Sequence, residues 1–127
     1  MINDYITSQW QGMWDNCIDN KLNNIQPVLA ERLPGCQLSR RDQVVLTRCR
    51  IGHGRLTHAY LLLNEPAPVC MSCLCQLTIK HVLLECTDFS DIRGLYFQAS
   101  SLRELFTQTN SSHIIEFLRR TGLYFSI

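Results

Sequence analysis

The sequence predicts a small, mainly α-helical domain built from several helices. Apolar residues recur at the three- and four-residue spacing of amphipathic helices along most of the chain, whereas the alternation typical of strands is weak. The 127 residues favour a single domain, and a hydrophobic content of 46% with 18% charged residues allows a packed core. Cysteine and histidine residues cluster between positions 70 and 86, where a bound metal ion could stabilise a core of this size.

We expect one domain over residues 1–127 with four consecutive regions. These are an N-terminal amphipathic helical region at 1–35, a basic helical segment at 39–63, a metal clip at 68–90 and C-terminal helices at 91–127. Pro27 and Pro34 interrupt the helical pattern after the first region, and residues 64–68, which hold two prolines, form a rigid linker before the clip.

The N-terminal region carries an apolar stripe over residues 5–25, on one side of a predicted helix that Asn3 or Asp4 would cap. Trp10 and Trp14 lie one turn apart on this stripe. We expect both indoles to belong to the core, since large aromatic side chains at helical spacing are usually buried. A stacking platform for nucleic-acid bases is the alternative.

The basic segment is predicted to form a helix over residues 40–51 that Ser39 caps and Gly52 ends. Its apolar face consists of Val45, Leu46 and Cys49. A second short helix follows over residues 56–63. His53 and His58 flank its start, and we interpret both as structural histidines because neither has a cysteine or histidine partner at ligand spacing.

Positive charge is concentrated in this segment. The chain has a net charge of +1, but residues 40–58 hold five arginines and one acid, Asp42. The five are Arg40, Arg41, Arg48, Arg50 and Arg55. They form either a solvated helix face or a strip that contacts nucleic-acid phosphates. Arg41, Arg48 and Arg55 are seven residues apart, but Gly52 and Gly54 leave it open whether Arg55 shares their face.

The most specific motif is C-x2-C-x7-H-x4-C, formed by Cys70, Cys73, His81 and Cys86. Three thiolates and one imidazole, close in sequence, are the donor set of a tetrahedral structural zinc site, and four protein ligands leave no open catalytic position. We therefore predict one structural Zn²⁺. Cys75 is a competitor that could replace Cys73 or Cys86. A redox pair at Cys70 and Cys73 is the second interpretation, although no strand–helix pattern precedes it.

The spacing within this motif restricts how the chain can reach the ion. Thr78 is expected to cap a helix that carries His81, and residue i+5 of a helix points about 140° away from residue i. Cys86 should therefore lie at or beyond the end of that helix. Helical spacing then predicts three C-terminal helices around Ile92, Leu105 and Ile115, followed by an apolar tail that packs down.

The remaining features bear on the cellular compartment. The sequence begins without a basic and apolar leader, and no apolar run is long enough to span a membrane, so we expect an intracellular protein of the nucleus or cytoplasm with no membrane partner. Reduced cysteines fit this expectation. Cys17, Cys36 and Cys49 lie outside the motif, and we expect them to be small buried hydrophobes.

Several motifs in order resemble the region that follows the reverse transcriptase and RNase H domains in Jockey-like and I-like non-LTR retrotransposon polyproteins. The matching stretches cover nearly the whole chain and are Trp10 to Trp14, Arg40 to Leu62, Glu65 to Pro68, Cys70 with Cys73, Leu77 to His81, Cys86 to Phe89 and Gly122 to Phe125. Two positions depart from the family pattern: Cys49 stands where leucine is expected, and Met71 where proline is frequent.

The resemblance implies a C-terminal piece of a retroelement enzyme, either a fragment or a domesticated remnant. Neither a polymerase aspartate pair nor an RNase H carboxylate set is evident, so we expect no enzymatic activity from this chain. In that family this region is inferred to bind nucleic acid, so the resemblance implies RNA or DNA as the partner. The alternative is a docking module for the upstream reverse transcriptase or RNase H domains, with Trp10 and Trp14 on the docking face.

Overall fold

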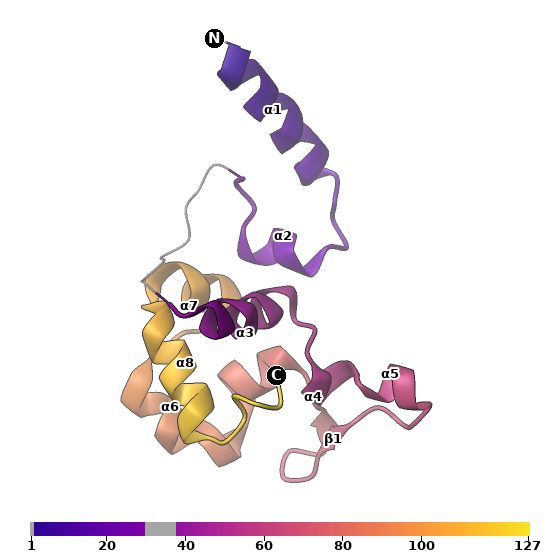
Figure 1. Cartoon of the computed structure of the whole chain (residues 1–127), viewed down its shortest axis with the longest axis vertical. Coiled ribbons are helices and arrows are strands. Elements are labelled where there is room, and N and C mark those ends of the chain that lie inside the picture. Colours follow the sequence, from indigo (N-terminus) through magenta and orange to yellow (C-terminus); the bar gives the residue numbers. More distant parts are fainter. Residues whose placement is uncertain (1, 30–37) are drawn as a thin grey trace.

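The computed structural model describes residues 2–29 and 38–127 and is mainly helical (Figure 1). The helices are α1 (Ile2–Asp15), α2 (Lys21–Ile25), α3 (Arg40–Ile51), α4 (Arg55–His58), α5 (Tyr60–Leu63), a π-helical turn (His81–Glu85), a 3₁₀ turn (Thr87–Phe89), α6 (Ser90–Tyr96), α7 (Leu102–Gln108) and α8 (Ser111–Arg120). Two short antiparallel strands, β1 (Val69–Cys70) and β2 (Cys75–Gln76), form a hairpin. The predicted fold class is confirmed, while Pro34 and Cys36 lie outside the described residues.

The core lies between α2, α3, the segment after the hairpin and the C-terminal helices α6, α7 and α8. Helix α8 is its centre, because Ile114, Ile115, Phe117 and Leu118 are all at most 1% exposed. Burying side chains of this size stabilises the fold by about 1.5–3 kcal/mol each. Tyr124 and Ile127 of the C-terminal tail (residues 123–127) are also buried, as the sequence predicted.

The N-terminal region differs from its prediction. Residues 5–25 do not form one helix, because α1 ends at Asp15 and Asn20 caps a separate α2 by accepting a hydrogen bond from the Leu22 amide. Figure 1 shows α1 projecting away from the body. Trp10 is 64% exposed, so its assignment to the core is wrong, whereas Trp14 is half-buried and donates its indole N–H to the Gln26 carbonyl.

Helix α3 confirms the prediction for the basic segment. Ser39 accepts a hydrogen bond from the Asp42 amide at the N-terminus, and Gly52 ends the helix in the left-handed region with φ of 71°. Glycine adopts that conformation without steric cost. Val45, Leu46 and Cys49 form the buried face, and burial raises the pKa of the Cys49 thiol to about 12.

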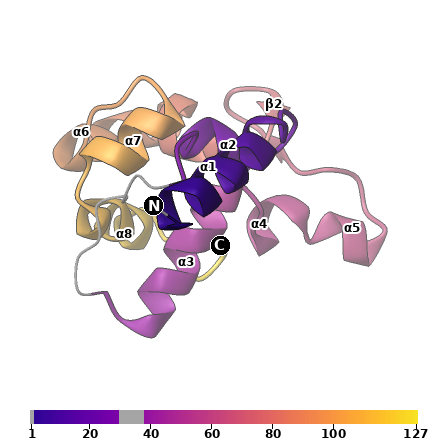
Figure 2. The same ribbon diagram turned by 90° about the horizontal axis from the view of Figure 1, so that it is seen from above.

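The segment after Gly52 forms two short helices instead of one. Helices α4 and α5 are separated at Ala59, and Figure 2 shows them as an arm at one side of the body. Leu61, Leu62 and Leu63 on α5 are exposed. The C-terminal tail runs past the start of this arm, where the Leu56 amide donates to the Ser126 carbonyl and a side chain at Gly54 would meet Ile127 at 3.2–3.4 Å.

A buried carboxylate connects α3 to the C-terminal tail. Asp42 accepts hydrogen bonds from the Tyr124 hydroxyl at 2.5 Å and from Arg119 at 2.8 Å. These contacts, with Tyr124 first and Ser39 and Arg119 after it, hold the pKa of the Asp42 carboxyl below its ordinary value despite burial. The ionised form of Asp42 therefore stabilises the folded state.

We expect Asp42→Asn to lower the free energy of unfolding at neutral pH by about 1–3 kcal/mol, since it removes the charge from a buried hydrogen-bonded acceptor. Because the pKa is lowered in the folded state, this contribution is full above the unfolded pKa of about 3.9 and is lost as pH falls through the folded pKa. Urea unfolding between neutral and acidic pH measures it. An Asp42→Asn variant with the same stability and acid profile as the parent would contradict this assignment.

The helices of the described ranges, 2–29 and 38–127, include none that is both long and apolar enough to cross a lipid bilayer.

Candidate metal centre and arginine groove

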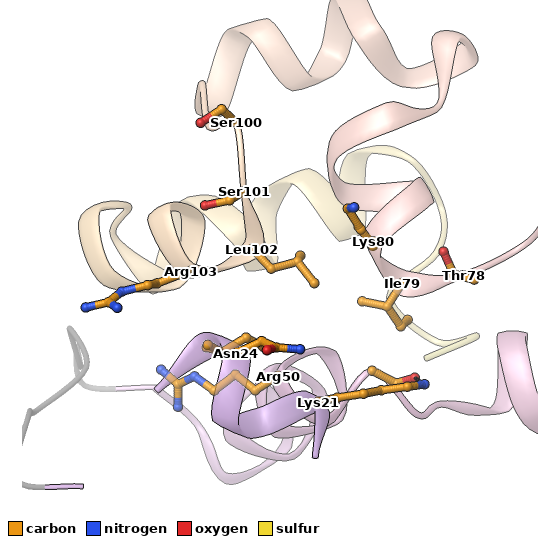
Figure 3. Close-up of a pocket in the computed structure, with 12 residues that line it drawn as sticks. Lys21, Asn24, Arg50, Thr78, Ile79, Lys80, Ser100, Ser101, Leu102 and Arg103 are labelled. Carbon is orange, nitrogen blue, oxygen red and sulfur yellow. Dashed lines mark hydrogen bonds between the residues drawn. The ribbon is translucent and has the colours of Figure 1, made fainter. Parts of the chain in front are cut away.

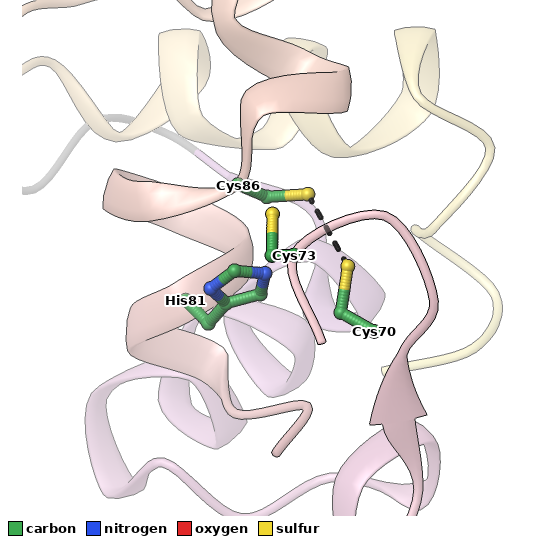
Figure 4. A group of neighbouring side chains, drawn as sticks. All are labelled: Cys70, Cys73, His81 and Cys86. Atoms are coloured by element: carbon green, nitrogen blue, oxygen red, sulfur yellow. Dashed lines mark hydrogen bonds between the residues drawn. The ribbon is translucent and has the colours of Figure 1, made fainter. Parts of the chain in front are cut away.

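The four predicted ligands converge on one point (Figure 4). The donor atoms of Cys70, Cys73, His81 and Cys86 all lie within 4.8 Å of one another. The sulfurs of Cys70 and Cys86 are 3.8 Å apart. The edge of a tetrahedron with metal–sulfur bonds of about 2.3 Å is also about 3.8 Å. These four residues can therefore hold a metal ion in a site with no position left open.

The first two ligands lie on the β1–β2 hairpin. Cys70 ends β1, and its carbonyl accepts a hydrogen bond from the Leu74 amide at 2.8 Å, which closes the turn that carries Cys73. Leu74 has a positive φ of 55°, a conformation that a branched side chain rarely adopts. The turn folds the chain so that the sulfurs of Cys70 and Cys73 face the same side.

The other two ligands lie at the ends of the π-helical turn. Thr78 accepts a hydrogen bond from the His81 amide, as predicted for the start of this segment. The Cys86 amide donates to the His81 carbonyl at 2.7 Å, an i to i+5 bond. The wider turn brings residue i+5 back toward the face of residue i. Cys86 lies beyond the helix end as expected, and the π-helical turn is what returns its sulfur to His81.

Hydrogen bonds around the sulfurs distinguish the thiols. The Thr87 hydroxyl, 3.5 Å from the Cys73 sulfur, and the Thr87 amide lower the pKa of Cys73. Burial raises the pKa of Cys86 to about 11, partly offset by a hydrogen bond from the Asp88 backbone. Asp88 also accepts a hydrogen bond from Ser72 at 2.6 Å, which joins the hairpin to the turn. Metal binding must displace the Cys86 proton.

Cys75 lies outside the converging set. Its side chain is exposed, and its sulfur contacts the His81 ring, 3.4 Å from Nδ1 and 3.7 Å from Nε2. Glu85 Oε2 lies 3.6 Å from the same Nδ1. A carboxylate beside Nδ1 is the usual partner of a histidine that binds metal through Nε2. Cys75 is thus a neighbour of the candidate ligand His81.

Arg93 is a supporting residue that the sequence did not reveal. Its guanidinium donates to three backbone carbonyls around the π-helical turn, those of Val82, Leu83 and Cys86, at 2.8–3.2 Å. Burial lowers the pKa of Arg93, so these three acceptors take the place of water around a charged group. The side chain holds the turn that carries Cys86, and no local pattern in the sequence marks it.

We expect Arg93→Met to weaken metal binding by about 10- to 100-fold, the range found when an outer-shell contact is lost. Methionine keeps the stem of the side chain but leaves the three carbonyls without their donor. Competition with a chromophoric chelator measures the affinity, and Arg120→Gln, an exposed charge change on α8, is the matched control. Equal affinities in both variants would show that Arg93 has no role at the site.

Four of the five predicted arginines line one depression, which we call the arginine groove. It has a volume of about 430 Å³ and is lined by Arg40, Arg41, Arg48, Arg55, Tyr124, Phe125 and Ile127, together with Val44 and Val45. Arg55 also lines this depression, even though Gly52 ends the helix. None of these lining residues has an acidic side chain, and within the described part of the chain no Asp or Glu forms an ion pair with any of the four arginines.

Aromatic side chains of the C-terminal tail form part of the groove. The Arg41 guanidinium lies 4.5 Å from the centroid of the Phe125 ring and 5.7 Å from that of Tyr124. Phe125 is 65% exposed. Arg48 donates to the main-chain oxygen of Ile127 at 3.2 Å, so its position is fixed. The groove thus combines four cations, of which Arg48 is held by a hydrogen bond, with an accessible aromatic face.

A second depression continues from the groove. Arg48 and Arg55 line both, and His53, His58 and exposed leucines of α5 complete the second. The two imidazoles stack with centroids 3.8 Å apart, and Thr57 contacts His58 Nδ1 at 2.6 Å, so His58 has the structural role that was predicted for it. Burial, His53 and Lys21 lower the pKa of His58, which keeps it neutral at physiological pH.

Arg50 does not join the other four. Side chains advance by about 100° per residue on a helix, so Arg48 and Arg50 point in nearly opposite directions. Arg50 packs near Phe106, 5.9 Å from its ring centroid, and lines a different cavity. Arg50 therefore lies apart from the groove that the other four line, because buried Cys49 turns its neighbour toward α7, and its contact with a phosphate stays a prediction.

No family model, no curated protein and no solved structure matches the chain.

Proposed function

We propose that this chain is a zinc-stabilised nucleic-acid-binding module, the C-terminal region of a retrotransposon reverse transcriptase polyprotein or a domesticated remnant of one. The observation that carries the proposal is the arginine groove: four guanidinium groups around one exposed phenylalanine, with no acidic residue among those that line it. Phosphates pair with guanidinium groups, and bases stack on aromatic rings.

The exposed ring favours single-stranded RNA or DNA over a duplex. Bases within a duplex are stacked on each other and cannot lie on a side chain, whereas an unpaired base can. Phe125 lies among the cations, so a strand whose phosphates contact Arg40 and Arg55 could place a base on it. The depression next to the groove, which shares Arg48 and Arg55, lengthens the path for such a strand.

The test is direct binding of the metal-loaded protein to a fluorescent single-stranded oligonucleotide at several salt concentrations. Four phosphate contacts predict that log K falls with log salt at a slope of about −3, and that affinity drops about 50-fold between 50 and 200 mM salt. Micromolar binding with this dependence supports the proposal. Absence of binding at low salt, or binding that ignores salt, would exclude it.

Zinc is the metal we propose for the centre. Three thiolates and one imidazole, with donor atoms within 4.8 Å of one another, match zinc better than the hard cations, which prefer oxygen donors. With four protein ligands, the ion would have a structural and not a catalytic role. Elemental analysis of protein purified without added metal, with an expected one zinc per chain, tests the identity of the ion.

A second candidate function rests on a different observation, the exposed apolar face of α1. Trp10 is 64% exposed and Met13 is 70% exposed, on a helix that projects from the body. An amphipathic helix of this kind fits a hydrophobic groove of a partner protein. We propose the reverse transcriptase or RNase H domains encoded upstream as that partner. Trp10→Ala with Met13→Ala should abolish co-purification with those domains and leave oligonucleotide binding unchanged.

A further inference from the structure

The cavity that holds Arg50 is a second cationic site, separate from the arginine groove. It has a volume of about 460 Å³ and lies between α2, the end of α3, the segment leading into His81 and the start of α7 (Figure 3). Lys21, Arg50, Lys80 and Arg103 line it, each from a different element, and no lining residue is acidic. We call it the Arg50 cavity.

Arg50 is the residue that most requires a ligand. Its Nε atom is buried and has no hydrogen-bond partner among the described residues. Burial also lowers the pKa of its guanidinium. A charged group that is partly removed from water is costly unless an opposite charge or an acceptor compensates it. An anion in the cavity would supply both the opposite charge and the hydrogen-bond acceptor for Arg50.

Two of the neighbouring cations, Lys21 and Lys80, are held by weak contacts. Lys21 Nζ reaches the Gly52 carbonyl at 3.4 Å, and Lys80 Nζ lies 3.5 Å from Glu85, with both side chains of that ion pair more than half exposed. Exposed pairs of this kind contribute little. The nearest carboxylate on α7, Glu104, accepts from the Ser100 amide and hydroxyl at 3.0 and 2.6 Å.

The remaining lining fits a ligand larger than an inorganic anion. Ile25, Ile79 and Leu102 form an apolar surface, and Asn24 points toward the centre between α7 and α2. A cavity of this volume is within the range for small-molecule sites. Guanidinium and ammonium groups beside an apolar surface are suited to a phosphate attached to a base and sugar.

We propose that the Arg50 cavity binds the phosphate of a nucleotide, either free or at the end of a nucleic-acid strand. Arg50 contacts the phosphate, the base or sugar lies on the apolar surface, and Lys21, which extends toward the opposite end of the cavity in Figure 3, contacts the base or sugar. The site goes beyond the proposed function, since Arg50 lies on another face of α3 and no residue that lines the cavity lines the arginine groove.

The experiment titrates the metal-loaded protein with adenosine 5′-monophosphate and follows backbone amide shifts by NMR. We expect saturable shifts at Gly52, Ser100 and Ser101, and competition by inorganic phosphate. Arg50→Met keeps the packing of the stem and Lys21→Gln changes an exposed residue that no core contact depends on. Each should weaken binding by about 10-fold, the effect of one charged hydrogen bond. Arg120→Gln, at an exposed arginine that lines neither the cavity nor the groove, should leave it unchanged.

Two further binding measurements show whether the phosphate belongs to a free nucleotide or to the end of a nucleic-acid strand. A single-stranded oligonucleotide with a 5′-phosphate should bind more tightly than its 5′-hydroxyl form if the cavity takes a strand end, and Arg50→Met should remove that difference. If the mononucleotide binds and the two oligonucleotides are equal, the ligand is a free nucleotide. Absence of saturable shifts with any of these probes, or equal binding by Lys21→Gln and the parent, overturns the inference. Mononucleotide binding without any oligonucleotide binding would exclude only the proposed function.

Discussion

Removal of the metal is expected to unfold at least residues 68–90. A structural zinc of this donor type contributes about 10–16 kcal/mol at neutral pH, whereas the whole net stability of a domain is about 5–15 kcal/mol. The hairpin has only two residues in each strand, and Cys86 is held by one turn, so neither ligand pair would keep its place alone. Since Ile79, Val82 and Leu83 between the ligands are core residues, the loss should spread into the body.

Far-UV circular dichroism and thermal melting, with and without a chelator, measure this loss. Cys70→Ser and His81→Ala should lose the metal. Without chelator, both variants should already give the circular dichroism signal and melting temperature of the chelator-treated parent. Cys75→Ser is the matched control, because Cys75 is an exposed cysteine that contacts His81 but lies outside the converging donors. Stoichiometric metal in both ligand variants, or an unchanged melting temperature in chelator, would refute the ligand assignment.

The same experiment has a pH dependence that burial determines. The pKa of Cys86 is raised to about 11 by burial, so this thiol is protonated in the metal-free protein at neutral pH. Binding must release its proton, and metal affinity should therefore fall as pH decreases.

Local sequence patterns predicted most of the fold, because each of the correctly predicted features depends only on residues that are close together in the sequence. The caps at Ser39 and Gly52, the core face of α3 and the ligand spacing from Cys70 to Cys86 are properties of a few adjacent residues, and the structure has all of them. The position of Cys86 beyond the helix end followed from helix geometry alone, although the π-helical turn did not.

The failures are at features that depend on distant parts of the chain. Trp10 was assigned to the core from its spacing, but only the packing of α1 determines whether a partner covers that face. Arg93 reaches the turn around Cys86 from α6, and Phe125 reaches Arg41 from the tail. The burial of Cys49 determines the side of α3 on which Arg50 lies. Counting the charges of the segment does not reveal on which face of the helix each arginine lies.

The second large effect is expected in the arginine groove. The double variant Arg41→Gln with Arg55→Gln should weaken oligonucleotide binding by roughly 10- to 100-fold at low salt. Each removed phosphate contact should also reduce the magnitude of the salt slope by about 1. Neither side chain belongs to the core, so the fold should be unaffected, which circular dichroism checks.

Phe125→Ala separates stacking from charge in the same assay. Loss of a base stacked on the ring should cost about 1–3 kcal/mol on single strands while the salt slope stays that of the parent, because no phosphate contact is removed. Arg120→Gln is the matched control for the charge change, since it is an exposed arginine that does not line the groove. If this control weakens binding as much as the groove variants do, the protein attracts nucleic acid through its overall charge and the groove has no special role.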